Sequence, residues 1–172
     1  MREELDKKLC EKYPLIFKNR YGNPQETLMC FGLECGSGWY NIIDALCGML
    51  YGEYGWAKER YDYLVEAGVG GVWYGKKLVT QEDIDAAKTK MDEEATKVPV
   101  VSQIKEKFGT LRFYVDRATD KHHNYISMAE AMSARTCEIC GNPGRIRGRS
   151  WMYTACDEHT EEEDLNNETK SD

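Results

Sequence analysis

The chain has 172 residues, of which 41% are hydrophobic and 31% charged, and its formal net charge is −7. This size and composition predict one folded core with room for a small appended module. There is no apolar run near the ~18–20 residues that a membrane-spanning helix needs, and the first residues are charged rather than apolar. These features exclude an integral membrane protein, and we expect a soluble, cytoplasmic one.

The charge is unevenly distributed along the chain. Residues 1–100 carry 13 basic and 17 acidic side chains, residues 101–151 carry 9 and 5, and residues 152–172 carry 1 and 8. A basic stretch therefore lies between an acidic body and an acidic tail. We expect the tail, residues 160–172, to be disordered because it has almost no apolar residue. This distribution disfavours general binding to nucleic-acid duplexes, which needs a broad positive surface, but permits a local anion site.

Helical patterns dominate the first hundred residues. Apolar residues at helical spacing predict four helices, over residues 2–12, 38–50, 54–67 and 81–96. Ser37 is the predicted cap of the second helix, and Thr80 and Asp83 form a predicted capping box at the fourth. In the third helix we expect the inward side to be Trp56, Tyr61, Leu64 and Val65. Residues 72–74 and 77–79 indicate two short strands around a turn.

Residues 100–115 predict a β-hairpin around Gly109-Thr110, a sequence typical of a type II′ turn. Pairing Phe108 with Leu111 makes one face apolar, with Ile104, Phe108, Leu111, Phe113 and Val115 as core. The other face carries Lys105, Lys107, Arg112 and Tyr114. In this register Lys107 lies opposite Arg112, and such like-charge pairs are unfavourable unless an anion or an acidic segment lies beside them. The alternative is a helix over 101–108, which would scatter the lysines.

A further helix is predicted over residues 124–136, after a polar loop that contains His122 and His123. Asn124 is its expected cap, and its inner side is predicted to be Tyr125, Met128, Ala129 and Met132. This helix runs directly into Cys137, so the segment that follows is joined to the body without a linker.

Two short Cys/His motifs follow that helix. Cys137-x-x-Cys140 is separated by fifteen residues from Cys156-x-x-His159. Such pairs can bind one metal from a tight turn, and two of them make a closed tetrahedral Cys₃His zinc site. Four protein ligands leave no position for water, which indicates a structural zinc ion rather than a catalytic one. The alternatives are four unrelated residues or a pair of disulfides.

The remaining cysteines are Cys10, Cys30, Cys35 and Cys47. The total of seven is odd and no signal peptide is evident, so reduced thiols are favoured over disulfides. Cys47 fits an apolar helical stripe and is expected in the core. Cys30 and Cys35 either join a second metal or redox site or are two half-buried thiols.

The segment between the two Cys/His motifs is basic and aromatic. Arg145, Arg147 and Arg149 alternate along a predicted strand, and Trp151 and Tyr153 continue the alternation. Arginines with aromatic neighbours on one face can bind phosphates and stack on bases. The alternative is that these arginines pair with the acidic tail.

Four segments resemble a group of small bacteriophage-encoded proteins of unassigned function that have a C-terminal CxxC…CxxH zinc module. They are residues 12–17, 34–44, 104–114 and 128–141. The resemblance leaves out residues 52–97, which it implies are an insertion, and the acidic tail. It brings no activity and no catalytic residue. It implies an accessory protein of the host bacterial cytosol, of the kind that acts as a regulator or a counter-defence factor.

Together these patterns predict an α+β protein in three parts. Residues 1–136 form a mostly helical body with a short antiparallel hairpin. Residues 137–159 form a zinc-ribbon-like module packed on that body, and residues 160–172 form the tail. Eleven Tyr and four Trp leave room for a homo-oligomer surface.

The function we expect is non-enzymatic binding of an anionic ligand or of a host protein. The ligand would be a nucleotide-like small molecule, such as a host-defence signal, on Lys105, Lys107, Arg112 and Tyr114, with Trp39, Tyr40 and Asp44 as further contacts. One alternative is a zinc-ribbon nucleic-acid-binding or transcription-accessory protein that uses Arg145, Arg147, Arg149 and Trp151. A second is a nucleotide-processing enzyme, whose candidates Glu34, Asp44, His122 and His123 have no evident partner residues.

Overall fold

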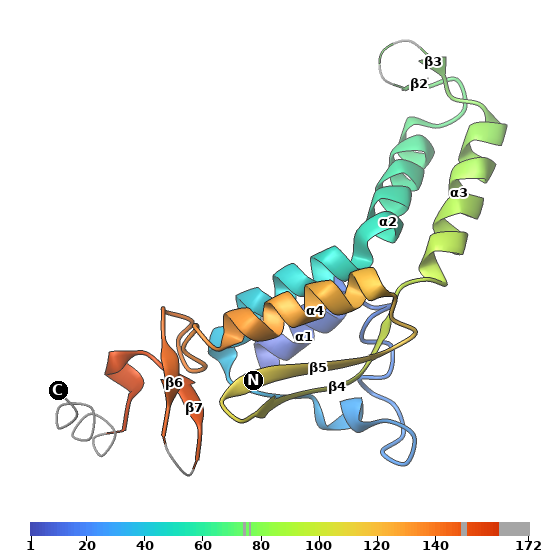
Figure 1. Cartoon of the computed structure of the whole chain (residues 1–172). Coiled ribbons are helices and arrows are strands. Elements are labelled where there is room, and N and C mark those ends of the chain that lie inside the picture. Colours follow the sequence, from blue (N-terminus) through green and yellow to red (C-terminus); the bar gives the residue numbers. More distant parts are fainter. Residues whose placement is uncertain (74, 76, 149–150, 162–172) are drawn as a thin grey trace. The chain divides into compact units, whose positions relative to one another are not determined.

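The computed structural model of the chain describes residues 1–73, 75, 77–148 and 151–161 (Figure 1). This part of the chain is α+β, which confirms the predicted fold class, with one three-stranded and two two-stranded sheets. The chain divides into two compact units. The first comprises Met1–Met49 and Pro99–Asp172, and the second is Leu50–Val98. The second unit agrees within two residues with the segment 52–97 that the resemblance leaves out; its origin as an insertion stays a prediction.

The first unit contains most of the elements. In chain order they are α1 (Glu3–Lys12), η1 (Leu28–Phe31), β1 (Leu33–Glu34), η2 (Ser37–Trp39), the first part of α2 (Tyr40–Ala67), β4 (Val100–Lys107), β5 (Thr110–Asp116), α4 (Asp120–Ser133), β6 (Arg145–Arg147), β7 (Tyr153–Ala155) and η3 (Asp157–His159). Ser37 is not a helix cap: it lies inside η2, and its Oγ accepts a hydrogen bond from the main-chain N–H of Arg2 at 3.0 Å.

The core of this unit lies between helices and one face of the sheet β1-β4-β5. A row of buried side chains crosses the three strands, because Leu33 pairs with Ile104 and Ile104 with Phe113. Helix α4 is tied to β5 by hydrogen bonds, one of them from the Leu111 N–H to Ser133 Oγ at 2.9 Å. Helix α1 is tied to α2, because the Tyr13 hydroxyl donates to Asp44 Oδ1 at 2.9 Å.

The β4-β5 hairpin is confirmed, but its register differs from the predicted one. Lys107 pairs with Thr110 and Lys105 with Arg112, so the two turn residues are Phe108 and Gly109. Both have positive φ, 56° and 74°, which is characteristic of a type I′ turn. The prediction of a type II′ turn at Gly109-Thr110 is wrong, and Phe108 is 59% exposed at the tip instead of buried in the core. Ile104, Leu111 and Phe113 are buried as predicted.

Replacing Phe108 by Asn is expected to stabilise the protein by about 0.5–1 kcal/mol. Phenylalanine adopts a positive φ only with strain, whereas Asn-Gly is a preferred pair for a type I′ turn. Urea denaturation of the variant and the wild type measures the difference. Phe108→Ala is the control, because alanine keeps the Cβ atom that makes this backbone conformation costly. Equal stability of the Asn and Ala variants would show that the turn is not strained.

The predicted helices 38–50 and 54–67 are confirmed as the two parts of α2, which is interrupted at Gly52 by non-helical angles, φ 32° and ψ −115°. The second unit contains the rest of α2, β2 (Val72–Trp73), β3 (Lys77–Leu78) and α3 (Gln81–Ala95). The two short strands are confirmed, although Tyr74 lies outside the described residues. The capping box between Thr80 and Asp83 is also confirmed.

The inward side of α2 in the second unit differs from the prediction. Its core is formed by Leu64 with Val79 and Ala87, and Tyr61 packs against them. Trp56 is 75% exposed, and Val65 is also exposed. Residues seven apart lie on the same side of a helix, so the buried side runs through Ala57 and Leu64, and Trp56 and Val65 lie to either side of it.

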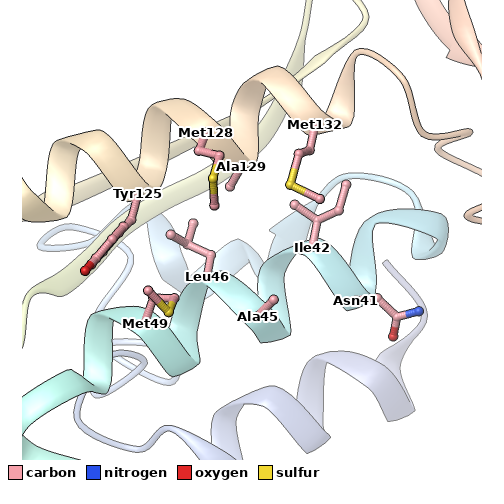
Figure 2. A pocket seen from close by; sticks show the side chains of 9 residues that line it. All are labelled: Asn41, Ile42, Ala45, Leu46, Met49, Tyr125, Met128, Ala129 and Met132. Atoms are coloured by element: carbon pink, nitrogen blue, oxygen red, sulfur yellow. The ribbon is translucent and has the colours of Figure 1, made fainter.

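Helix α4 starts earlier than predicted, and its buried side is rotated. The cap is Thr119 rather than Asn124, in a capping box with His122, so both histidines lie in the first turns of the helix and not in a loop. The buried residues are Ile126, Ala129 and Ser133. The methionines of the predicted inner side are about half exposed and face α2 across a groove that the nine residues labelled in Figure 2 line.

Candidate functional site

The structure brings the four predicted metal ligands together. One ligand atom each from Cys137, Cys140, Cys156 and His159 lies within 4.8 Å of all the others. Cys137 Sγ is 3.8 Å and Cys156 Sγ 3.1 Å from His159 Nδ1, and the sulfurs of Cys140 and Cys156 are 3.7 Å apart. Among the described residues this is the one group of three or more side chains that could hold a metal ion.

Local hydrogen bonds form the two turns that carry these ligands. In the first, the Gly141 N–H donates to the Cys137 carbonyl at 2.9 Å, and the Cys137 N–H donates to the Asn142 carbonyl at 2.8 Å. In the second, the His159 N–H donates to the Cys156 carbonyl at 3.1 Å. The antiparallel pair β6-β7 joins the two turns and so brings residues sixteen positions apart to one metal-sized site.

The donor set of three thiols and one imidazole could hold a metal ion, and its separations can be compared with those of a tetrahedral zinc site. Ligand atoms held 2.0–2.3 Å from zinc at tetrahedral angles lie about 3.5–3.8 Å from one another. Two of the measured separations are in this range, and the third is shorter. Burial alone would raise the pKa of Cys137, but the main-chain N–H groups around it lower the pKa to about 6, which favours the thiolate that binds metal. All seven cysteines are free thiols, so the disulfide alternative is wrong.

The Cys₃His cluster is packed on the rest of the first unit. The N–H groups of Gly36 and Gly38 donate to the carboxylate and the main-chain carbonyl of Glu138, each at 2.7 Å. A Cβ atom on either glycine would overlap the main-chain oxygens of Glu138 or Cys137. On the other side of the module, Thr154 Oγ1 donates to the Gly109 carbonyl at 2.5 Å. The start of α2 and the β4-β5 turn are therefore both joined to the Cys/His segment.

The polar face of the sheet is the face opposite the helices. It carries the predicted Lys105, Lys107, Arg112 and Tyr114 on β4 and β5. Lys105 lies directly opposite Arg112, and its Nζ is 5.6 Å from the centroid of the Tyr114 ring. Arg112 Nη1 donates to Thr110 Oγ1 at 2.5 Å and to the Leu111 carbonyl at 2.7 Å. Within the part of the chain that the structure describes, no carboxylate forms an ion pair with these three cations.

The other three predicted ligand contacts do not join this face. Trp39 is fully buried, and its indole N–H donates to the Thr136 carbonyl at 2.8 Å, so it cannot touch a ligand. Asp44 lies on α2, on the helical side, and accepts hydrogen bonds from Lys12 and Tyr13. Tyr40 begins the same helix. A helical pattern placed these residues on one element, but it could not show which side of the sheet that element covers.

The strand predicted to carry Arg145, Arg147 and Arg149 on one exposed face forms only in part. Arg145 and Arg147 lie on β6 and both reach Asp157, which follows the ligand Cys156. Arg147 is buried, so the expected exposed row of guanidinium groups does not form. Asp157 thereby takes the role that the pairing alternative gave to the acidic tail. Arg149 and the tail from residue 162 onward lie outside the described residues. Trp151 is 78% exposed.

The structure has a cleft that was not predicted from the sequence. It lies between the β4-β5 turn and residues 151–152, has a volume of about 320 Å³ and is lined by Glu106, Lys107, Phe108, Trp151 and Met152. The pattern placed Phe108 in the core because it assumed the wrong turn. A two-residue turn centred on Phe108-Gly109 would have placed this side chain at the exposed tip.

Other reactive groups are separate from one another. Cys30 donates its thiol to the Thr27 carbonyl, and burial raises the pKa of Cys35 to about 12, so the structure does not join them in a second site. His122 caps α4, where burial lowers its pKa, and Glu34 accepts a hydrogen bond from Gln103. The groove in Figure 2 has a volume of about 160 Å³ and is apolar, with no charged residue in its lining.

Within the described residues, no helix is both long enough and apolar enough to cross a membrane. Comparison with protein-family models found no match for this chain, and neither did comparisons with curated proteins and with solved structures. Two features of the molecule therefore bear on its function: the Cys₃His cluster and the polar face of the sheet.

Proposed function

We propose that the protein is a non-enzymatic, zinc-stabilised binding protein whose ligand is an anion held on the polar face of the sheet. The zinc ion would be coordinated by Cys137, Cys140, Cys156 and His159. With four protein ligands it is structural, because no position stays open for water or substrate. The resemblance to small phage-encoded proteins supports a narrower form of this proposal, in which the anion is a nucleotide signal of host defence.

The observation that carries the anion proposal is the pair of like charges at Lys105 and Arg112. Directly opposed cations on neighbouring strands destabilise a sheet unless a counter-charge lies beside them. Two other cations of this unit do have carboxylate partners, in the pairs Lys12–Asp44 and Arg20–Asp6. Lys105, Lys107 and Arg112 form no ion pair among the described residues. Glu34, the strand partner of Lys105 on β1, lies on the same face but accepts a hydrogen bond from Gln103 instead. A phosphate group, with several acceptor oxygens, would supply that partner, and arginine can bind it through two parallel hydrogen bonds.

Calorimetric titration with inorganic tripolyphosphate at low salt tests this proposal. We expect Arg112→Ala and Lys105→Ala each to weaken binding about tenfold or more, since a hydrogen bond to a charged group contributes about 1.5–3 kcal/mol. Lys8→Ala is the matched control: it removes one exposed cation from α1, away from the sheet face, and should leave the affinity unchanged. If the wild type does not bind tripolyphosphate, or the three variants weaken binding equally, the polar face is not an anion site.

A further inference from the structure

Two exposed aromatic side chains from different hairpins line one cleft beside the polar face. Phe108 is at the tip of the β4-β5 turn, and Trp151 precedes β7. They are 59% and 78% exposed. The volume of about 320 Å³ is within the range of about 300–1,000 Å³ that is common for small-ligand sites.

Main-chain contacts hold the two hairpins together at this cleft. Thr154 Oγ1 donates to the Gly109 carbonyl at 2.5 Å, and the Gly109 Cα packs so tightly on β7 that a Cβ atom there would lie 3.1 Å from the Tyr153 nitrogen. The Glu138 N–H donates to the Thr154 carbonyl at 2.9 Å, which ties β7 to the first turn of the metal cluster. The β4-β5 turn and β7 are therefore held together by backbone packing.

The turn carries an aromatic residue where the backbone disfavours one. Phe108 has a φ of 56°, a conformation that asparagine or glycine adopts at lower cost. Its side chain does not recover that cost by burial, because most of the ring is in solvent. Strained residues of this kind are concentrated at binding sites, where the strained conformation presents a side chain to a ligand.

The cations of the polar face lead directly to this cleft. Lys107 lines it, with Nζ 5.1 Å from the centroid of the Phe108 ring. Thr110 is the strand partner of Lys107, and its Oγ1 accepts a hydrogen bond from Arg112. The one carboxylate in the lining, Glu106, accepts a hydrogen bond from the Gly109 N–H at 2.5 Å and so stabilises the turn. Aromatic surface and unpaired positive charge are thus continuous.

From this juxtaposition we propose that the cleft binds the base of a nucleotide by stacking on Phe108 and Trp151, while its phosphates lie on Lys107 and Arg112. The inference rests on the proposed anion site and makes it specific: the ligand class is nucleoside polyphosphates rather than phosphates in general. Every base has a π face, so the two aromatic side chains would provide affinity for any base. Selectivity among bases would come from polar groups at the edge of the cleft.

The test compares tripolyphosphate with the four ribonucleoside triphosphates by calorimetry. We expect the best nucleotide to bind about 5- to 150-fold more tightly than tripolyphosphate, the contribution of one stacked base. Phe108→Asn and Trp151→Ala should remove this advantage and leave tripolyphosphate binding unchanged. Both variants should fold, since Asn suits the turn and Trp151 is exposed; zinc content and circular dichroism verify this. Trp56→Ala, another exposed tryptophan, is the control and should have no effect.

The outcomes separate this inference from the anion site itself. If tripolyphosphate binds as tightly as every nucleotide, or if both aromatic variants keep the advantage of the nucleotide, stacking in this cleft is wrong and the anion site stands. If neither probe binds, the anion site is wrong and this inference with it. A single-stranded deoxythymidine octamer that binds more tightly than any nucleotide would assign the cleft to nucleic acid and overturn the small-ligand inference.

Discussion

Removal of zinc is expected to release residues 134–161 from the body of the protein. Structural zinc sites contribute about 10–16 kcal/mol of apparent binding free energy in small zinc domains, and this energy is also folding energy. Here β6 and β7 are only three residues each, and the buried cluster between them contains little besides Cys137, Ala155 and Cys156. Without the metal, this segment has too small a core to remain folded.

Native mass spectrometry and amide hydrogen exchange test this expectation. The purified protein should carry one zinc ion per chain. Chelation, or Cys156→Ser, should abolish exchange protection in residues 134–161 and reduce it at the contacts of the module, the segment 36–39 and the turn at Gly109. The second unit, Leu50–Val98, should keep its protection, because it is a separate compact unit.

Cys30→Ser is the matched control for the cysteine substitution. The Cys30 thiol only donates to the Thr27 carbonyl, and a serine hydroxyl can do the same. This variant should keep its zinc and its exchange pattern. A zinc-free protein with unchanged protection in residues 134–161 would contradict a structural role for the metal.

Replacement of Asp6 by Asn is expected to destabilise the first unit by about 3–5 kcal/mol, the cost of breaking a buried ion pair from one side. Asp6 is buried and accepts hydrogen bonds from Arg20 Nε at 3.0 Å and Arg20 Nη2 at 2.7 Å. Arg20 also donates to the Cys30 carbonyl at 3.1 Å. The pair therefore connects α1 to the long segment between α1 and β1, and the variant would leave a partly buried guanidinium without its counter-charge.

The Asp6–Arg20 pair is also expected to make the free energy of unfolding decrease at acid pH. Burial alone would raise the pKa of Asp6, but hydrogen bonds from Arg20 and Cys10 outweigh it and hold the pKa below the ordinary value of 3.8. A lowered folded-state pKa stabilises the protein at pH values above the unfolded-state pKa. This contribution is lost as pH falls through the folded-state pKa. The Asn variant should therefore show a shallower loss of stability below pH 4 than the wild type.

Urea denaturation at neutral and acid pH, followed by circular dichroism, measures both effects. Glu11→Gln is the control on the same helix. Glu11 forms an exposed pair with Lys7 at 3.8 Å, and such pairs contribute about 0–1 kcal/mol. Equal destabilisation by the two substitutions would show that the Asp6–Arg20 pair does not hold α1 in place.

The zinc module has a structural and an indirect functional role in the proposed mechanism. It holds β7, which Trp151 precedes, against the β4-β5 turn through Thr154 and Gly109. Loss of zinc should therefore weaken nucleotide binding more than tripolyphosphate binding, since the aromatic cleft depends on both hairpins and the cation face only on one. The metal would act by positioning a binding surface and not by contacting the ligand.

Local features were predictable from the sequence because they depend on a few neighbouring residues. The four metal ligands follow from two short motifs, the capping box from Thr80 and Asp83, and the β-hairpin from a turn between two apolar strands. The polar face was also predictable, because side chains alternate along a strand. Alternation places Lys105 and Lys107 on one side of β4, and Arg112 and Tyr114 on one side of β5, in either hairpin register. These elements do not require knowledge of what packs against them.

Tertiary packing decided the rest, because it selects among local conformations that are close in energy. Phe108 adopts a positive φ and lies in the turn, so the hairpin register differs from the predicted one. The Phe108 side chain is therefore exposed and not in the core. Packing of α4 on β5 turned Ile126 inward and left Met128 exposed, and the burial of Trp39 removed it from any ligand surface. The sequence by itself determined the metal cluster and the cationic strand face. Only the tertiary structure placed Trp151 and Phe108 in the lining of one cleft, because that cleft joins residues 43 positions apart from two separate hairpins.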